Sequence, residues 1–148
     1  ALILSTVAGA ASAQAVRTER NMSLDLANRI ATAAVAACSE KGYAVTTTVV
    51  DRAGTVRAVQ RADNAGPHTL EASRAKAFTS ASAKNTTLAM MENTQKNPAA
   101  ATLVYIPGFL LVGGGVPVKV VNKVKDGRPH IADMIKAGII DGSIDPKK

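Results

Sequence analysis

Two histidines and one cysteine are the side chains of this 148-residue sequence best suited to metal binding. His68 follows Gly66-Pro67 at the expected start of a helix, where a neutral imidazole can ligate a heme iron or another metal. The alternative is a surface histidine without a ligand. His130 lies in a polar C-terminal region, and Cys38 lies in an Ala-rich helical pattern that favours a small buried thiol.

A second group of candidates combines charged side chains with glycines. Glu71, Arg74 and Lys76 share one expected helix, and the i, i+3 spacing of Glu71 and Arg74 is typical of a surface ion pair. Gly113-Gly114-Gly115 allows the backbone to approach another strand or a flat ligand closely. The alternative is a tight loop between two core strands. The glycines do not form a Walker-type loop or a GxGxxG motif, and no serine stands in a Gly-x-Ser-x-Gly turn, so no motif names a reaction.

These glycines belong to the longest nearly uncharged run outside the N-terminus, Leu103–Val121. Such a run, rich in β-branched residues, predicts buried strands. We expect strands over 109–112 and 116–124, joined through the three glycines. The run would then be the central hairpin of a sheet.

Composition limits the classes of partner. The formal net charge is +7, but the basic residues are scattered and are not interleaved with aromatic residues, so we expect a solvated basic surface and no nucleic acid. A single cysteine excludes an intrachain disulfide and a CxxC site. The length indicates one domain.

The first thirteen residues, 1–13, resemble the apolar part of a secretory signal peptide. They are uncharged and end in Ala11-Ser12-Ala13, a small-residue cleavage pattern. They are too short to span a bilayer comfortably, so we expect no transmembrane segment. On this interpretation a single domain occupies 14–148, in the periplasm or outside the cell. The alternative is an ordinary N-terminal helix or strand.

The elements that must position these residues alternate between helical and extended patterns. Asn21 or Ser23 is expected to cap a helix that runs to about Lys41. A hairpin follows, with strands over 43–50 and 55–61 around the Asp51–Gly54 turn. Further helices are expected over 68–83, from about 86 to 96, and over 99–106. Because the strands are joined as hairpins, the order predicts an α+β fold with an antiparallel sheet flanked by helices.

The ordered set of motifs resembles the GlcG/HbpS family, also described as heme-degrading-domain or DUF336-like and related to the C-terminal domain of PduO-type proteins. The residues that carry the resemblance span roughly 24–124. They are the Ala-rich first helix, the Val-x-Asp-x-x-Gly turn at Val49, Asp51 and Gly54, the run from Glu71 to Ala77, and Pro-Gly followed by Gly-Gly-Gly-Val-Pro.

The resemblance implies an α+β fold, homo-oligomers, and binding of heme or a related tetrapyrrole in some members. The family members share no obvious iron ligand, and in this sequence His68, at the junction of a loop and a helix, is the best candidate. Arg74 and Lys76 would pair with propionates, because charge-assisted contacts to carboxylates are strong, and Gly114 and Gly115 would line the cofactor site.

The sequence departs from the family after Val124, where Lys125-Asp126-Gly127 replaces an apolar strand. The last family strand is therefore expected to be missing or replaced, which leaves a sheet edge to be covered.

Three functions stay open. The first is a secreted or periplasmic heme-binding protein in heme handling or sensing. The second is an enzyme of small-molecule metabolism, and the third is an accessory protein that acts through an oligomer surface.

Overall fold

The computed structural model describes residues 18–119, and its elements follow the predicted order. Helix α1 spans Leu24–Ser39, strands β1 and β2 span Thr46–Val50 and Val56–Arg61, and helix α2 spans Thr69–Ala83. Helix α3 spans Thr87–Lys96, and the 3-10 helix η1 spans Pro98–Tyr105. Among these residues no helix is long and apolar enough to cross a membrane.

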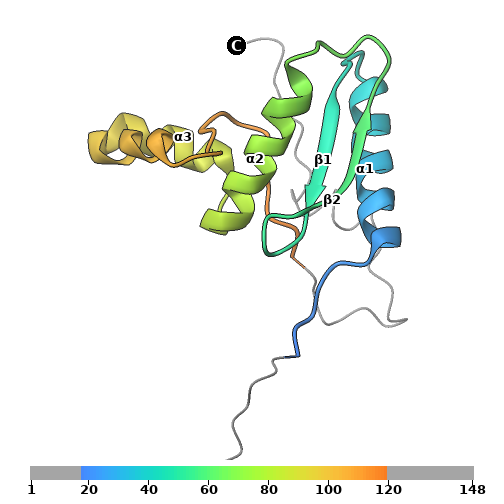
Figure 1. The fold of residues 1–148 in the computed structure, drawn as a ribbon. Coiled ribbons are helices and arrows are strands. Elements are labelled where there is room, and N and C mark those ends of the chain that lie inside the picture. Colours follow the sequence, from blue (N-terminus) through green and yellow to red (C-terminus); the bar gives the residue numbers. More distant parts are fainter. Residues whose placement is uncertain (1–17, 120–148) are drawn as a thin grey trace, which may run out of the picture.

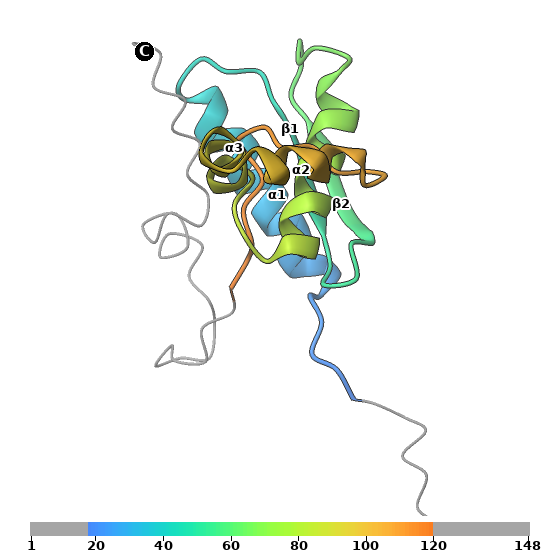
Figure 2. The same cartoon turned by 90° about the vertical axis from the view of Figure 1, so that its left-hand side faces the viewer.

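The described part of the chain is built in layers around one antiparallel hairpin. In Figure 1, α1 lies on one side of β1 and β2, α2 lies on the other, and α3 with η1 lies beyond α2. Figure 2, turned by 90°, places α2 and α3 in front of the strands and α1 behind them. The α+β prediction is therefore confirmed.

Helix α1 covers one sheet face with small apolar side chains. Ser23 caps the helix, since its Oγ accepts a hydrogen bond of 3.2 Å from the Leu26 N–H. The buried cluster between helix and hairpin consists of Ala27, Ile30, Ala31, Val49 and Ala58. Burial of apolar area is the main stabilising term here.

Helix α2 packs against the other face of β1 through hydroxyl groups. The Thr46 and Thr69 hydroxyl oxygens lie 2.7 Å apart, and those of Thr48 and Ser73 lie 2.7 Å apart. Each pair satisfies two polar groups that burial would otherwise penalise. This fixes the rotation of α2, and with it the direction in which its charged residues point.

The prediction of strands over 109–112 and 116–124 is wrong for the described residues. Residues 106–119 form turns and irregular backbone, and the sheet of the described part contains only β1 and β2. The reason is that this segment's polar backbone groups bond to threonine side chains: the Leu110 N–H donates to Thr79 Oγ1 at 2.8 Å. Residues 120–124, and the expected missing strand, lie outside the described residues. The helix expected over 99–106 is confirmed as η1.

Candidate functional site

His68 stands at the N-cap of α2 and is exposed. Its side chain makes no capping hydrogen bond. The ring lies over Gly66, where an added Cβ would be 2.8 Å from Cε1 and 2.9 Å from Nδ1. Gly66 therefore makes room for the imidazole. No residue within 18–119 hydrogen-bonds the ring, so a ring nitrogen is available to a ligand from outside the described part of the chain.

Arg74 forms the surface ion pair that its spacing predicts. Its Nε donates to Glu71 Oε2 at 2.9 Å, and both side chains are largely exposed. Such an exposed pair on a helix contributes at most about 0.5 kcal/mol. Residues two apart on a helix do not face each other, so Arg74 and Lys76 point away from the axis in different directions.

Lys76 meets the predicted glycine loop. Its Cδ and Nζ atoms each lie 3.6 Å from the position that a Cβ on Gly114 would occupy, and Gly114 has a φ of +121°. The side chain is half-buried, and burial lowers the pKa of the Lys76 ammonium below its usual value of 10.5. Within residues 18–119 its amine has no ion pair or hydrogen bond.

Gly115 holds the loop in this position. An added Cβ would lie 2.4 Å from the Lys76 carbonyl oxygen and 2.8 Å from Thr87 Cγ2, so only glycine fits. The Gly115 N–H donates to Thr87 Oγ1 at 2.8 Å, and the Thr87 N–H donates to the Gly115 carbonyl at 2.9 Å. Thr87 is fully buried. Of the predicted site residues, the structure thus brings together Lys76, Gly114 and Gly115.

His68 and Arg74 do not join this group. His68 precedes Lys76 by eight residues, which corresponds to about 12 Å along a helix axis. The described part of α2 therefore offers two separate contact points, an imidazole at its start and an amine in its middle.

Two buried threonines were missed at the sequence level. Thr79 receives the Leu110 N–H and itself donates to the Ala75 carbonyl at 2.8 Å, while Thr87 receives the Gly115 N–H. Both side chains are fully buried in otherwise ordinary helical positions. The only sequence feature that could have indicated these threonines is a polar residue among small residues on the inward face of a helix.

Phe78 explains two of the glycines in the family motifs. An added Cβ on Gly54 would lie 2.6 Å from the Phe78 ring, and one on Gly108 would lie 3.3 Å from it. Both glycines have positive φ, +79° and +84°. Phe109 meets the same ring edge-to-face, with centroids 6.1 Å apart. One aromatic residue of α2 thus joins the hairpin turn to the Pro-Gly turn.

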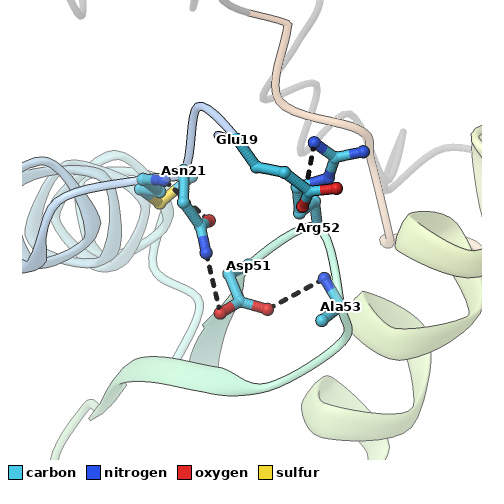
Figure 3. A network of polar contacts seen from close by, with 6 residues as sticks. Glu19, Asn21, Asp51, Arg52 and Ala53 are labelled. Carbon is cyan, nitrogen blue, oxygen red and sulfur yellow. Dashed lines mark hydrogen bonds and ion pairs between the residues drawn. The ribbon is translucent and has the colours of Figure 1, made fainter. Parts of the chain in front are cut away.

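Asp51 organises the hairpin turn. Its Oδ1 accepts the Ala53 and Thr55 N–H groups at 2.9 and 3.1 Å, and its Oδ2 accepts the Asn21 amide at 3.3 Å. Figure 3 shows this contact beside the Arg52–Glu19 ion pair, which is 3.2 Å long. Burial raises the pKa of Asp51, but these donors and the Arg57 charge outweigh it and hold the pKa below 3.8. The carboxylate is therefore committed to structure.

A hollow of about 530 Å³ lies beside the C-terminal end of α1. None of the predicted site residues lines it. Its walls are Val35, Ser39, Gly42, Tyr43, Ala44, Arg61, Ala62 and Asp63. Among residues 18–119 no group of three or more His, Cys, Asp or Glu side chains is placed to hold a metal ion. His130 lies outside the described residues.

Comparison with known proteins decides the family. The family model described as haem degrading protein HbpS-like matches residues 22–125, which is well over half of the chain. The chain belongs to the HbpS-like family. The crystal structure of HbpS itself is 35% identical, with 76% of this chain and 77% of that chain covered and a TM-score of 0.68.

Other solved structures place the HbpS-like chain in the same fold. A double mutant of Streptomyces reticuli HbpS is 32% identical, with 79% and 78% of the two chains covered and a TM-score of 0.68. The DUF336 protein ORFY of Klebsiella pneumoniae is 27% identical over 74% and 77%, with a TM-score of 0.67. A PduOC:heme complex, at 22% identity over 68% and 71% and a TM-score of 0.55, shows the fold alone.

A short match of a different kind involves 24 residues that are 83% identical to the carbamoyl phosphate synthase large chain of Ralstonia nicotianae. It covers 16% of this chain and 2% of that protein. A match to so small a part of a large protein carries no functional argument.

Proposed function

We propose that this HbpS-like chain is a secreted or periplasmic protein that binds heme or a related tetrapyrrole, for heme handling or sensing. The observation that carries the proposal is the arrangement on α2, where an exposed imidazole without a hydrogen bond precedes a half-buried amine without a partner among residues 18–119. The family description and the heme bound by the PduOC relative support it.

The residues present fit the chemistry of a heme. His68 would ligate the iron through its imidazole. Lys76 would pair with a propionate, beside a loop where Gly114 leaves the space of a Cβ open. Arg74 is less available, because its guanidinium is already bonded to Glu71. When bound, heme would supply a Lewis-acidic, redox-active iron.

The location rests on the sequence of 1–13, which lies outside the described residues. We expect cleavage after Ala13, so that the mature chain begins at Gln14. Expression with a native leader, followed by fractionation and N-terminal sequencing, checks this. An uncleaved N-terminus in the cytoplasmic fraction would contradict it.

Hemin titration followed in the visible spectrum tests the binding proposal. The wild-type chain should give a saturable shift of the Soret band. His68→Ala should abolish or displace that band, because it removes the iron ligand, whereas the control His130→Ala should leave it unchanged. An unchanged band in His68→Ala would show that His68 is not the ligand.

We expect the chain to form a homo-oligomer. Successive residues at the end of η1 are exposed and apolar, with Val104, Tyr105 and Ile106 at 50%, 82% and 42% exposure. In the described part, β1 and β2 pair with no third strand, and free strand edges and apolar surface are commonly covered by association. Light scattering of the purified chain checks this, and a monomer at micromolar concentration would contradict it.

An enzyme of small-molecule metabolism is the second candidate, and the hollow at the end of α1 favours it. Arg61, Asp63 and Tyr43 all line this hollow, and no ion pair joins Arg61 to Asp63. Turnover of a small molecule by protein free of tetrapyrrole would support this function. Loss of that turnover in Tyr43→Phe, together with unchanged hemin binding, would separate the two sites.

A further inference from the structure

Three polar groups without described partners meet where α2 contacts the glycine loop. The Lys76 amine is the first. The other two are the N–H groups of Gly113 and Gly114, neither of which donates a hydrogen bond to another residue in 18–119, whereas the Gly115 N–H is bonded to Thr87. Gly114 lies beside the amine, since Lys76 Nζ is 3.6 Å from the position that a Cβ on Gly114 would occupy, and Gly113 is its neighbour in the loop.

The position of these donors is fixed by buried contacts. Thr87 and Gly115 exchange hydrogen bonds through the Thr87 N–H and hydroxyl, and the Thr79 hydroxyl accepts the Leu110 N–H. Gly115 cannot carry a side chain, because the Lys76 carbonyl lies 2.4 Å from where its Cβ would be. The loop is thus locked against the same helix turn that carries the amine. Gly114 itself is exposed, so the site opens to solvent.

Electrostatics selects the sign of a ligand. A partly desolvated ammonium loses hydration that no described carboxylate replaces, and this loss lowers the pKa of Lys76. An anion would restore that stabilisation with a charge-assisted hydrogen bond, and successive backbone N–H groups form concavities that favour anions. Glu71, the acidic residue nearest in sequence on α2, is engaged with Arg74.

We infer that Lys76, with the Gly113 and Gly114 amides, forms a carboxylate-binding site that works without a tetrapyrrole. This inference deepens the proposed function and rests on it in one respect: a heme propionate would be one of the carboxylates that the site binds. The site would also accept small free monocarboxylates. A single ammonium with two N–H donors in contact with water supports weak binding, with a dissociation constant on the order of 1 mM.

The test is an amide and lysine side-chain NMR titration of the full chain with acetate, against sodium chloride at equal ionic strength and against inorganic phosphate. Acetate should give saturable shifts at Gly113, Gly114 and the Lys76 side chain. Lys76→Gln should weaken the binding at least tenfold, Lys76→Arg should retain most of it, and the exposed control Lys84→Gln should change nothing.

Each remaining outcome is decisive. Shifts with chloride equal to those with acetate, phosphate binding without acetate binding, or an unchanged affinity in Lys76→Gln would overturn the inference. If Lys76→Gln alters amide signals throughout the domain, the wild-type titration decides, because saturable acetate shifts at residues other than Lys76, Gly113 and Gly114 would overturn the inference. Saturable acetate binding by a protein that gives no Soret shift with hemin would support the carboxylate site and reject heme binding. A Soret shift with hemin, without acetate binding, would reject the carboxylate site alone.

Discussion

The α1–hairpin half and the glycine-loop segment are held together by different forces. The first half joins α1, β1 and β2 through an apolar cluster around Ile30 and Val49. The glycine-loop segment, residues 106–119, packs on α2 and α3. The buried threonines Thr79 and Thr87 bind its backbone, and its glycines allow close contacts. Apolar packing tolerates small changes of shape, whereas a polar contact without spare volume does not. Lys76 contacts this less tolerant segment from α2, so the glycine side of the site depends on it.

The largest effect should come from Gly115→Ala. The new Cβ would meet the Lys76 carbonyl at 2.4 Å, a backbone atom that cannot rotate away, and overpacking of this kind costs about 3 kcal/mol. Urea unfolding should show this loss. Gly113→Ala is the matched control in the same loop, since its Cβ would meet the flexible Leu88 side chain at 3.3 Å. Equal losses in the two variants would contradict the account of the loop.

Thr87→Val should cost about 2 kcal/mol, because it leaves the buried Gly115 N–H without an acceptor while keeping the side-chain volume. Denaturant unfolding measures the loss. The control Thr102→Val removes an exposed hydroxyl that donates only within η1, and it should be nearly neutral. A neutral Thr87→Val would show that the hydroxyl does not hold the loop.

Ile30→Val tests the apolar half and should cost about 1 kcal/mol. Ile30 is almost fully buried between α1 and the hairpin, whereas Leu24 on the same helix is 54% exposed. Leu24→Ala should therefore change the free energy of unfolding less than Ile30→Ala does. Thermal or urea unfolding decides, and the opposite order would contradict the assigned core.

Acid should act on the hairpin turn through Asp51. Its folded pKa lies below 3.8, so its stabilisation is fully present above pH 3.8 and is lost as the pH falls through the folded pKa. The stability difference between wild type and Asp51→Asn should shrink over that acid range. Asp25→Asn is the control, because the Asp25 carboxylate is exposed and its ion pair with Arg29 is long, at 3.9 Å. A difference independent of pH would show that the Asp51 charge is not the stabilising feature.

The smallest effect should come from Arg74→Ala. Its exposed ion pair with Glu71 contributes at most about 0.5 kcal/mol. Hemin affinity should change much less than in Lys76→Gln. An equal loss of affinity in the two variants would assign a propionate contact to Arg74 as well.

The sequence predicted the hairpin and the helices because their signals are local. The Asp51–Gly54 turn, the cap at Ser23 and the Ala-rich pattern of α1 each follow from neighbouring residues. Leu24 is an exception on this apolar helix, because it lies in the first turn of α1 and is largely exposed.

The segment after η1 could not be predicted in the same way. Its apolar residues and glycines have the composition of strands, but its N–H and C=O groups bond to threonines about 30 residues earlier. Nothing in the local pattern reveals such distant partners. The sequence placed Lys76 and Gly114 in the same cofactor site but did not predict how they contact each other. The structure supplies the geometry of that contact.

Binding of the tetrapyrrole along α2 is the central claim, and the position of the iron in crystals of the hemin complex tests it most directly. An iron anomalous difference map should show a peak beside the His68 imidazole, with a propionate toward Lys76 and Gly114. A peak elsewhere, for instance beside Tyr43 in the hollow at the end of α1, would contradict the account.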